Sequence, residues 1–313
     1  MNRYKNKIAI TTGDVNGIGA EITIKALNFL NLPKDDIVLI SNEKITDFYE
    51  KLNTPYEIIN IDFEGEPEPS KICKESGEFS YNSLKTACEI KPKAIVTAPV
   101  AKEALHLAGH NFNGQTEVLE KFLSHDNQKA EMLFVANDFR VLLLTRHIPL
   151  KTVSESITDE LICKKVSTVK EFFAKYLDNK NPKFALCALN PHAGENGIIG
   201  TEEKNIIIPA CEELRKNGTN ITNPLPADTL FINACKNYSK NLPQQYDCYF
   251  AMYHDQGLIP IKTAASDKTV NITIGLDIIR TSPCHGTAFD IAGKNKADFS
   301  SMISAIKTAQ QYA

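Results

Sequence analysis

Three histidines each follow a run of apolar residues that is typical of a buried strand. His147 follows RVLLLTR, His192 follows FALCALNP and His254 follows CYFAMY. Because parallel strands bring their carboxyl ends to one edge of a sheet, the three imidazoles are expected to converge there. Neutral imidazoles bind divalent ions such as Zn²⁺, and three of them leave coordination positions open for a substrate. The alternative for each histidine taken alone is a structural or simply exposed side chain.

Two acidic residues could serve the same edge of the sheet. Asp255 directly follows His254, and Asp228 lies in the segment NPLPADTLF. A carboxylate in either place could be a further metal ligand, orient a ligand histidine or carry a proton.

Two other segments carry groups that suit an anion. The turn ITTGDVNGIGAEI places Gly13, Gly17 and Gly19 between a strand and a helix, where backbone N–H groups could face a ligand. Its spacing matches neither G-x-G-x-x-G nor a P-loop, so a plain tight turn is the alternative.

The run VNITIGLDIIRTSPCHGTAFDIAGK offers Asn271, Arg280 and His285, and Lys262 lies shortly before it. Arg and Lys can clamp phosphate or carboxylate, or simply be solvated.

The elements that position these residues alternate between short apolar runs and helical patterns, which indicates an α/β fold with mostly parallel strands. No long linker divides the chain, so two lobes that share elements and enclose a cleft are expected. The acidic segment 62–70 is expected to be a surface loop. Strands are expected at 8–12, 37–41, 94–98, 140–145, 184–189 and 248–252, and helices at 18–30, 159–177, 202–216 and 299–309.

Composition excludes several classes of protein. The 313 residues hold 35 Lys and Arg against 38 Asp and Glu, and a net charge of -3 gives no general attraction for nucleic acid or an anionic membrane. No run of residues is apolar and long enough to span a bilayer. Eight cysteines without a C-x-x-C pair, behind an N-terminal MNRYKNKIAI that does not resemble a secretory signal, favour a reducing cytoplasm.

Several blocks of sequence, in order along nearly the whole chain, carry a family resemblance. The most specific are LNPHAGENG, AMYHDQGLIPIK and IRTSPCHGTAFDIAGK, and others include GDVNGIGAE, FNGQTEVLE and PLPADTLF. They resemble the 4-hydroxythreonine-4-phosphate dehydrogenases, the PdxA family. The resemblance implies the α/β fold of isocitrate and isopropylmalate dehydrogenases, with two interlocked α/β/α lobes, a cleft, and an active site at the interface of a homodimer. The first lobe is then expected at 1–128 and 268–313, and the second at 129–267.

The same resemblance implies roles for individual residues. A divalent metal (Zn²⁺, Mg²⁺ or Co²⁺), shared between two subunits, is expected on His147, His192 and His254. NAD⁺ or NADP⁺ is expected at Gly13, His285, Gly286 and Asp290. Substrate contacts are expected from Gln115, Thr116, Lys262, Asn271 and Arg280, and acid–base roles from Asp228, Asp255 and Lys262.

The chain departs from the family at a few positions. Gln115 stands where the family usually has His, so it cannot become cationic, although an amide can still donate a hydrogen bond. The implied reaction oxidises 4-phosphooxy-L-threonine and decarboxylates the product to 3-amino-2-oxopropyl phosphate, in vitamin B6 biosynthesis. Gln115 keeps open a sister activity on 4-phosphothreonate or 4-phosphoerythronate. The other departures, Val15, Asn16, Ala20 and Cys284, are expected to adjust turns more than chemistry.

Overall fold

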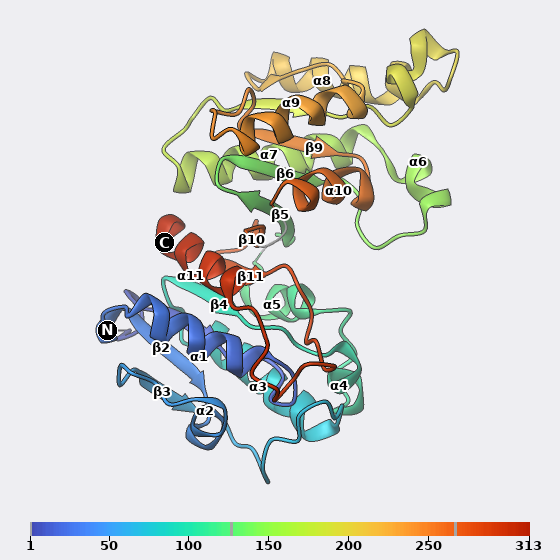
Figure 1. Ribbon diagram of the computed structural model, residues 1–313. Helices are drawn as coiled ribbons and strands as arrows, with labels where there is room; N and C mark the ends of the chain where they lie inside the picture. The colour runs from blue at the N-terminus through green and yellow to red at the C-terminus, as the bar shows by residue number, and fades with distance from the viewer. Residues whose placement is uncertain (1, 126–127, 266–267) are drawn as a thin grey trace. The chain divides into compact units, whose positions relative to one another are not determined.

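The computed structural model describes residues 2–125, 128–265 and 268–313, and the chain divides into two compact units (Figure 1). Unit 1 consists of Met1–Ala130 and Val270–Ala313, and unit 2 of Glu131–Thr269. Each unit has its own strands and helices.

Unit 1 is built on parallel strands that cross over through helices. Its strands lie in the order β3-β2-β1-β4-β11-β10. Every neighbouring pair is parallel except β11 and β10, which form an antiparallel hairpin. The elements are β1 (Ile8–Thr11), α1 (Gly19–Leu30), β2 (Ile37–Ser41), α2 (Glu43–Tyr49), β3 (Glu57–Asn60), α3 (Lys74–Glu89), β4 (Ala94–Thr97), α4 (Lys102–Leu107), α5 (Gln115–Leu123), β10 (Val270–Ile274), β11 (Ile279–Pro283) and α11 (Ser300–Tyr312).

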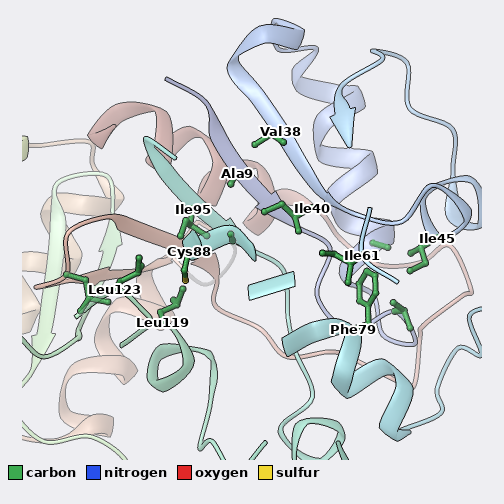
Figure 2. Packing of buried hydrophobic residues seen from close by; sticks show 14 of the residues in the cluster. Ala9, Val38, Ile40, Ile45, Ile61, Phe79, Cys88, Ile95, Leu119 and Leu123 are labelled. Atoms are coloured by element: carbon green, nitrogen blue, oxygen red, sulfur yellow. The ribbon is translucent and has the colours of Figure 1, made fainter. Parts of the chain in front are cut away.

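The central strands of unit 1 are buried on both faces. Ala9 pairs with Val38 and with Ile95, so these three side chains point to one face, where they pack in a cluster with Phe79 of α3 and Leu119 of α5 (Figure 2). Helices α1 and α11 pack against each other, and α11 also packs against β11 and β4. Burial on both sides explains why β1, β2 and β4 appear in the sequence as unbroken apolar runs.

Unit 2 repeats this arrangement with strand order β5-β6-β9-β7-β8. The pairs β6–β9, β9–β7 and β7–β8 are parallel, and β5 is antiparallel to β6. Helices α9 and α10 pack together, as do α7 and α8. The elements are β5 (Glu131–Ala136), β6 (Phe139–Leu143), α6 (Val153–Ser156), α7 (Asp159–Tyr176), β7 (Lys183–Leu186), α8 (Ile208–Lys216), β8 (Asn220–Ile221), α9 (Ala227–Ser239), β9 (Cys248–Ala251) and α10 (His254–Ala265).

The helix expected at 202–216 is two elements. A π-helical turn covers Glu203–Ile207, and α8 begins at Ile208. Pro209 lies in the first turn of α8 and has no N–H to bond to the preceding turn, so the regular α-helical ladder cannot run through it. Segment 62–70 has no regular secondary structure, as expected.

A buried ion pair joins two elements of unit 2. Lys165 of α7 donates to Glu131 of β5 at 2.5 Å and to the carbonyl of Leu143 at 3.3 Å, and both charged side chains are only 7% exposed. We expect Lys165→Met alone to lower the free energy of unfolding by about 3–5 kcal/mol, because the Glu131 carboxylate stays buried without its cation. Adding Glu131→Leu should restore most of that loss. Urea unfolding of the single and double variants measures both, and equal stabilities for them would contradict the expectation.

The cysteines are free thiols. Within the part of the chain that the structure describes, no helix has the length and apolar character to cross a membrane.

Candidate active site

The three predicted metal-binding histidines follow three neighbouring parallel strands of unit 2. His147 comes after β6, His254 comes after β9 at the start of α10, and His192 comes after β7. Strand β9 lies between β6 and β7 and is parallel to both. The topology therefore carries all three chain segments to the same edge of the sheet.

His147 and His254 lie close together. Their ring centroids are 5.7 Å apart, and both line one pocket of about 280 Å³. Two hydrogen bonds beyond the strand ends hold the two segments together. Thr145 donates from its amide and from its hydroxyl to the carbonyl of Met252, at 3.1 and 2.7 Å. The other residues that line the pocket are Thr145, Arg146, Ile148, Leu150, Val153, Tyr253 and Asp255.

Asp255 orients the imidazole of His254. The carboxylate accepts a hydrogen bond of 2.6 Å from Nδ1 of His254. A carboxylate can only accept, so Nδ1 carries a proton in this bond. A neutral imidazole of this tautomer has its lone pair on Nε2, which is the arrangement found around metal-ligating histidines. Of the roles open to Asp255, the geometry fits that of orienting a ligand.

His192 lies outside the residues that line this pocket. Its side chain is exposed, in a segment with left-handed backbone. Across residues 2–125, 128–265 and 268–313, no group of three His, Cys, Asp or Glu side chains is close enough to hold a metal ion. The structure thus brings two of the three predicted ligands together. The two imidazoles fit a divalent ion by their chemistry, and the third ligand stays a prediction.

Asp228 and Lys262 also lie outside the pocket lining. Asp228 is exposed in the first turn of α9 and accepts a bond from the amide of Thr229 at 2.9 Å. Lys262 is exposed in the last turn of α10, about 12 Å along the helix from His254. Their acid–base roles stay predictions.

Unit 1 contains a buried cation. Arg280 of β11 is 3% exposed and donates to the hydroxyl of Thr97 from Nε at 2.8 Å and from Nη2 at 2.6 Å. Its Nη1 lies 3.4 Å from the hydroxyl of Thr273. Burial lowers the pKa of the guanidinium to about 10, so it remains charged at neutral pH. No carboxylate of the described residues forms an ion pair with it, and a buried cation without an anion fits an anionic ligand.

Two unpaired amide oxygens accompany Arg280 in unit 1. Register pairs Thr273 with Arg280, so Asn271, two residues before Thr273, lies on the same face of the hairpin. The Oδ1 of Asn271 and the Oε1 of Gln115 are buried, and neither has a hydrogen-bond partner in the described parts of the chain. Such orphan acceptors in a folded protein call for an explanation, and a ligand that donates to them supplies one.

One hydrogen bond fixes the orientation of the Gln115 side-chain amide. Nε2 donates to the carbonyl of Ala98 at 3.1 Å, so Oε1 must be the free end. The side-chain NH₂ has two N–H donors and the bond to Ala98 uses one of them, so the expectation that Gln115 can donate to a ligand stays a prediction. Thr116, beside it in the first turn of α5, is buried.

The predicted cofactor residues lie at two loops of unit 1. His285, Gly286 and Asp290 are exposed in the loop between β11 and α11. The amide of Ile18 donates to the carbonyl of Thr287 at 3.0 Å, which ties this loop to the Gly-rich turn. Gly13 has a φ of +70°, and a Cβ there would lie 2.2 Å from the carbonyl oxygen of Pro99, so only glycine fits.

Asn16 is a structural link that the sequence did not reveal. Its side chain is 1% exposed, accepts from the amide of Glu68 at 2.8 Å and donates to the carbonyl of Lys71 at 2.8 Å. Ser70 of the same segment bonds to the carbonyl of Phe289 in the predicted cofactor loop. The acidic loop therefore packs against both loops that are expected to hold the dinucleotide. The only sign in the sequence is an amide side chain between Gly13 and Gly17 in a tight turn.

Asp14 gives unit 1 a pH-dependent stability. Burial raises the pKa of its carboxyl from 3.8 to about 6, against the opposing effect of bonds from Asn16 and Ser76. Between these two pH values the folded state binds more protons than the unfolded one, so the free energy of unfolding falls as pH rises, by about 3 kcal/mol in total. Asp14→Asn should remove this dependence, which urea unfolding from pH 4 to 7 measures. The exposed control Asp35→Asn should keep it, and identical profiles for the two variants would refute the assignment.

The fold is that of a dehydrogenase. The crystal structure of 4-hydroxythreonine-4-phosphate dehydrogenase from Klebsiella pneumoniae matches with a TM-score of 0.85 and 32% sequence identity, over 98% of this chain and 99% of that chain. The predicted α/β fold class is confirmed.

The chain belongs to the PdxA family, because the sequence model of that family, described as pyridoxal phosphate biosynthetic protein PdxA, matches residues 7–309. It is 40% identical to the 4-hydroxythreonine-4-phosphate dehydrogenase of Sulfurihydrogenibium sp. (strain YO3AOP1), over 97% of each chain. It is also 36% identical to the D-threonate 4-phosphate dehydrogenase of Salmonella typhimurium, over 98% of each chain. The family predicted from the sequence blocks is confirmed.

Proposed function

We propose that this protein is a metal- and NAD(P)⁺-dependent dehydrogenase that oxidises 4-phosphooxy-L-threonine and decarboxylates the product to 3-amino-2-oxopropyl phosphate, a step of vitamin B6 biosynthesis. The observation that carries the proposal is the pair of imidazoles over one pocket, His147 and His254, in a chain whose relatives are named for this reaction. A further support is the buried Arg280 of unit 1, which forms no ion pair with any of the described residues.

His147, His254 and His192 are the residues proposed to hold the divalent metal. When bound, such an ion favours ionisation of the substrate alcohol and supplies an electron sink for decarboxylation. Asp255 holds His254 with Nε2 free for that role. Asp228 and Lys262 are the remaining candidates for proton transfer.

Arg280 is proposed to bind the phosphate or the carboxylate of the substrate through charge-assisted hydrogen bonds. Thr116, at the N-terminus of α5, and Lys262 are proposed to assist with anionic groups. The unpaired oxygens of Asn271 and Gln115 suit the donors of the substrate, its ammonium or hydroxyl groups. NAD⁺ or NADP⁺ is proposed to bind at the turn of Gly13 and the loop of His285, Gly286 and Asp290, and to accept the hydride.

We further propose a homodimer with the active site at its interface. A large apolar side chain is exposed within a few residues of each proposed metal ligand along the chain: Leu150 is 70% exposed, Ile198 is 81% exposed and Ile259 is 64% exposed. Apolar surface around polar ligands is typical of an interface that a partner subunit covers. A fully active monomer in light scattering would contradict this assembly. Free thiols support a reducing, cytoplasmic location.

The second candidate is a sister activity on a phosphorylated sugar acid, such as 4-phosphothreonate or 4-phosphoerythronate. It is favoured by Gln115, which presents a neutral acceptor that can bind a hydroxyl as well as an ammonium group. A relative of nearly equal identity is named D-threonate 4-phosphate dehydrogenase.

A substrate-profile assay tests both candidates. The purified protein is incubated with NAD⁺ or NADP⁺, with Zn²⁺, Mg²⁺ or Co²⁺, and with each phosphorylated amino or sugar acid, while absorbance of the reduced nicotinamide is followed. The highest kcat/KM with 4-phosphooxy-L-threonine would support the main proposal, and preference for 4-phosphothreonate or 4-phosphoerythronate would support the second. No reduction with any of them would contradict both.

A further inference from the structure

The segment that carries His192 has an unusual backbone. Five consecutive residues after β7 have left-handed φ values: His192 (52°), Ala193 (54°), Gly194 (74°), Glu195 (44°) and Asn196 (57°). Residues with a Cβ rarely adopt this conformation, and a run of them persists only where the surroundings fix it. The contacts that fix this segment therefore decide where the imidazole of His192 lies.

Glu203 supplies the most buried of these contacts. It begins the π-helical turn and is 2% exposed. Its Oε1 accepts from the amides of Leu189 and Asn190, at 2.9 and 2.7 Å, and its Oε2 accepts from Nδ2 of Asn190 at 2.9 Å. A single carboxylate thus holds the chain just before the left-handed run begins.

Glu202, its neighbour, links the same segment to the chain that follows His147. Its Oε2 accepts from Nδ2 of Asn190 at 2.8 Å, and its Oε1 accepts from the hydroxyl of Ser154 in α6 at 2.5 Å. These hydrogen bonds hold the pKa of Glu202 below its usual value, so it stays ionised. Val153, next to Ser154, lines the pocket of His147 and His254. The two glutamates therefore hold His192's segment against the neighbouring histidine segment.

Close packing shows that this arrangement leaves no spare room. A Cβ on Gly194 would lie 2.7 Å from Oε2 of Glu203, and a Cβ on Gly200 would lie 2.5 Å from Nδ2 of Asn190. Both glycines also have positive φ, a backbone conformation that other residues rarely adopt, so glycine is needed at each position for two reasons.

We propose that Glu203, through the hydrogen bonds to Leu189 and Asn190, is the positioning residue that holds His192 in place to bind a divalent metal. The inference rests on the proposed function, because that function makes His192 a metal ligand. Glu203 does not touch the metal or the substrate. It acts by pre-organising the ligand segment, so its loss should weaken metal binding in protein that is still folded.

The test compares metal affinity and local order in four variants. Zn²⁺ affinity is measured by competition with a chelator, local order by hydrogen exchange of the Leu189 and Asn190 amides in the metal-free protein, and global stability by thermal unfolding.

Glu203→Gln places an NH₂ group against Nδ2 of Asn190 and removes the charge that three N–H groups share. We expect at least 10-fold weaker Zn²⁺ binding and at least 10-fold faster exchange of the two amides. Asn190→Ala should give smaller changes in the same direction. Because Asn190 is partly exposed, this variant keeps the test possible if Glu203→Gln does not fold. Glu212→Gln, the same change on the exposed face of α8, should alter neither.

The outcomes separate this inference from the proposed function. His192→Ala is the fourth variant, and it should lose Zn²⁺ affinity if the histidine is a ligand. If it does, while Glu203→Gln and Asn190→Ala bind Zn²⁺ as tightly as the parent, then Glu203 is only structural and the inference is overturned while the function stands. If His192→Ala itself binds Zn²⁺ like the parent, the metal assignment fails, and the positioning role falls with it.

Discussion

Replacing His192 with alanine is expected to remove divalent-metal binding and to lower dehydrogenase turnover by about 1000-fold or more. Loss of the ion removes several kcal/mol of stabilisation of the developing negative charge, and about 4 kcal/mol corresponds to a factor of 1000 in rate. The chain should still fold, because the side chain of His192 is exposed and contributes little to the core. His147→Ala and His254→Ala should behave in the same way.

Metal content by mass spectrometry, turnover by reduced-nicotinamide absorbance and folding by circular dichroism measure the three parts of this result. The matched control is His125→Ala in unit 1, an exposed histidine that pairs with Asp277 at 3.2 Å and should leave metal and turnover unchanged. Parent-like metal content and turnover in His192→Ala would remove His192 from the site. A loss of both in His125→Ala would show that the assay reports general damage.

The sequence predicted the strands well because unit 1 and unit 2 bury them on both faces. The strands expected at 8–12, 94–98 and 248–252 begin at the expected residues, and in the structure each ends one residue earlier than expected. Thr12, Ala98 and Met252, the residues just beyond those ends, are nevertheless completely buried. An apolar run therefore reports burial, which continues into the packed loops, whereas the end of a strand is set by where its neighbour stops pairing.

The strand-end position of the histidines could be predicted, but the order of the strands could not. Nothing in the local sequence says that β9 lies between β6 and β7, which is what brings His147 beside His254. The orientation of the Gln115 side-chain amide could not be predicted either, because it depends on a hydrogen bond to the carbonyl of Ala98, 17 residues earlier. Glu203 gave no signal either, since two of its three hydrogen bonds come from backbone amides, which every residue except proline carries.

Replacing Arg280 with lysine is expected to raise KM for the phosphorylated substrate by about 10- to 100-fold while Zn²⁺ affinity stays at the parent value. A lysine keeps the charge but has no planar fork, so it cannot bond Thr97 and Thr273 and still present two parallel N–H groups to a phosphate or carboxylate. The loss of a charge-assisted hydrogen bond, about 1.5–3 kcal/mol, corresponds to that range of KM. Metal affinity should not change, because the three proposed ligands are on unit 2 and Arg280 is on unit 1.

Arg215→Lys is the matched control for this prediction. Arg215 donates to the carbonyl of Ile221 at 3.1 Å and to Asn223 at 2.9 Å, in a region that is not proposed to bind substrate. The same replacement there should leave KM unchanged. Because Arg280 is buried, its replacement could also destabilise the fold, so thermal unfolding is measured beside the kinetics. A smaller folded fraction would lower the apparent kcat, whereas the loss of a substrate contact raises KM. A parent-like KM in a fully folded Arg280→Lys protein would mean that the buried guanidinium serves only to bridge Thr97 and Thr273, and that the substrate's anionic groups bind elsewhere.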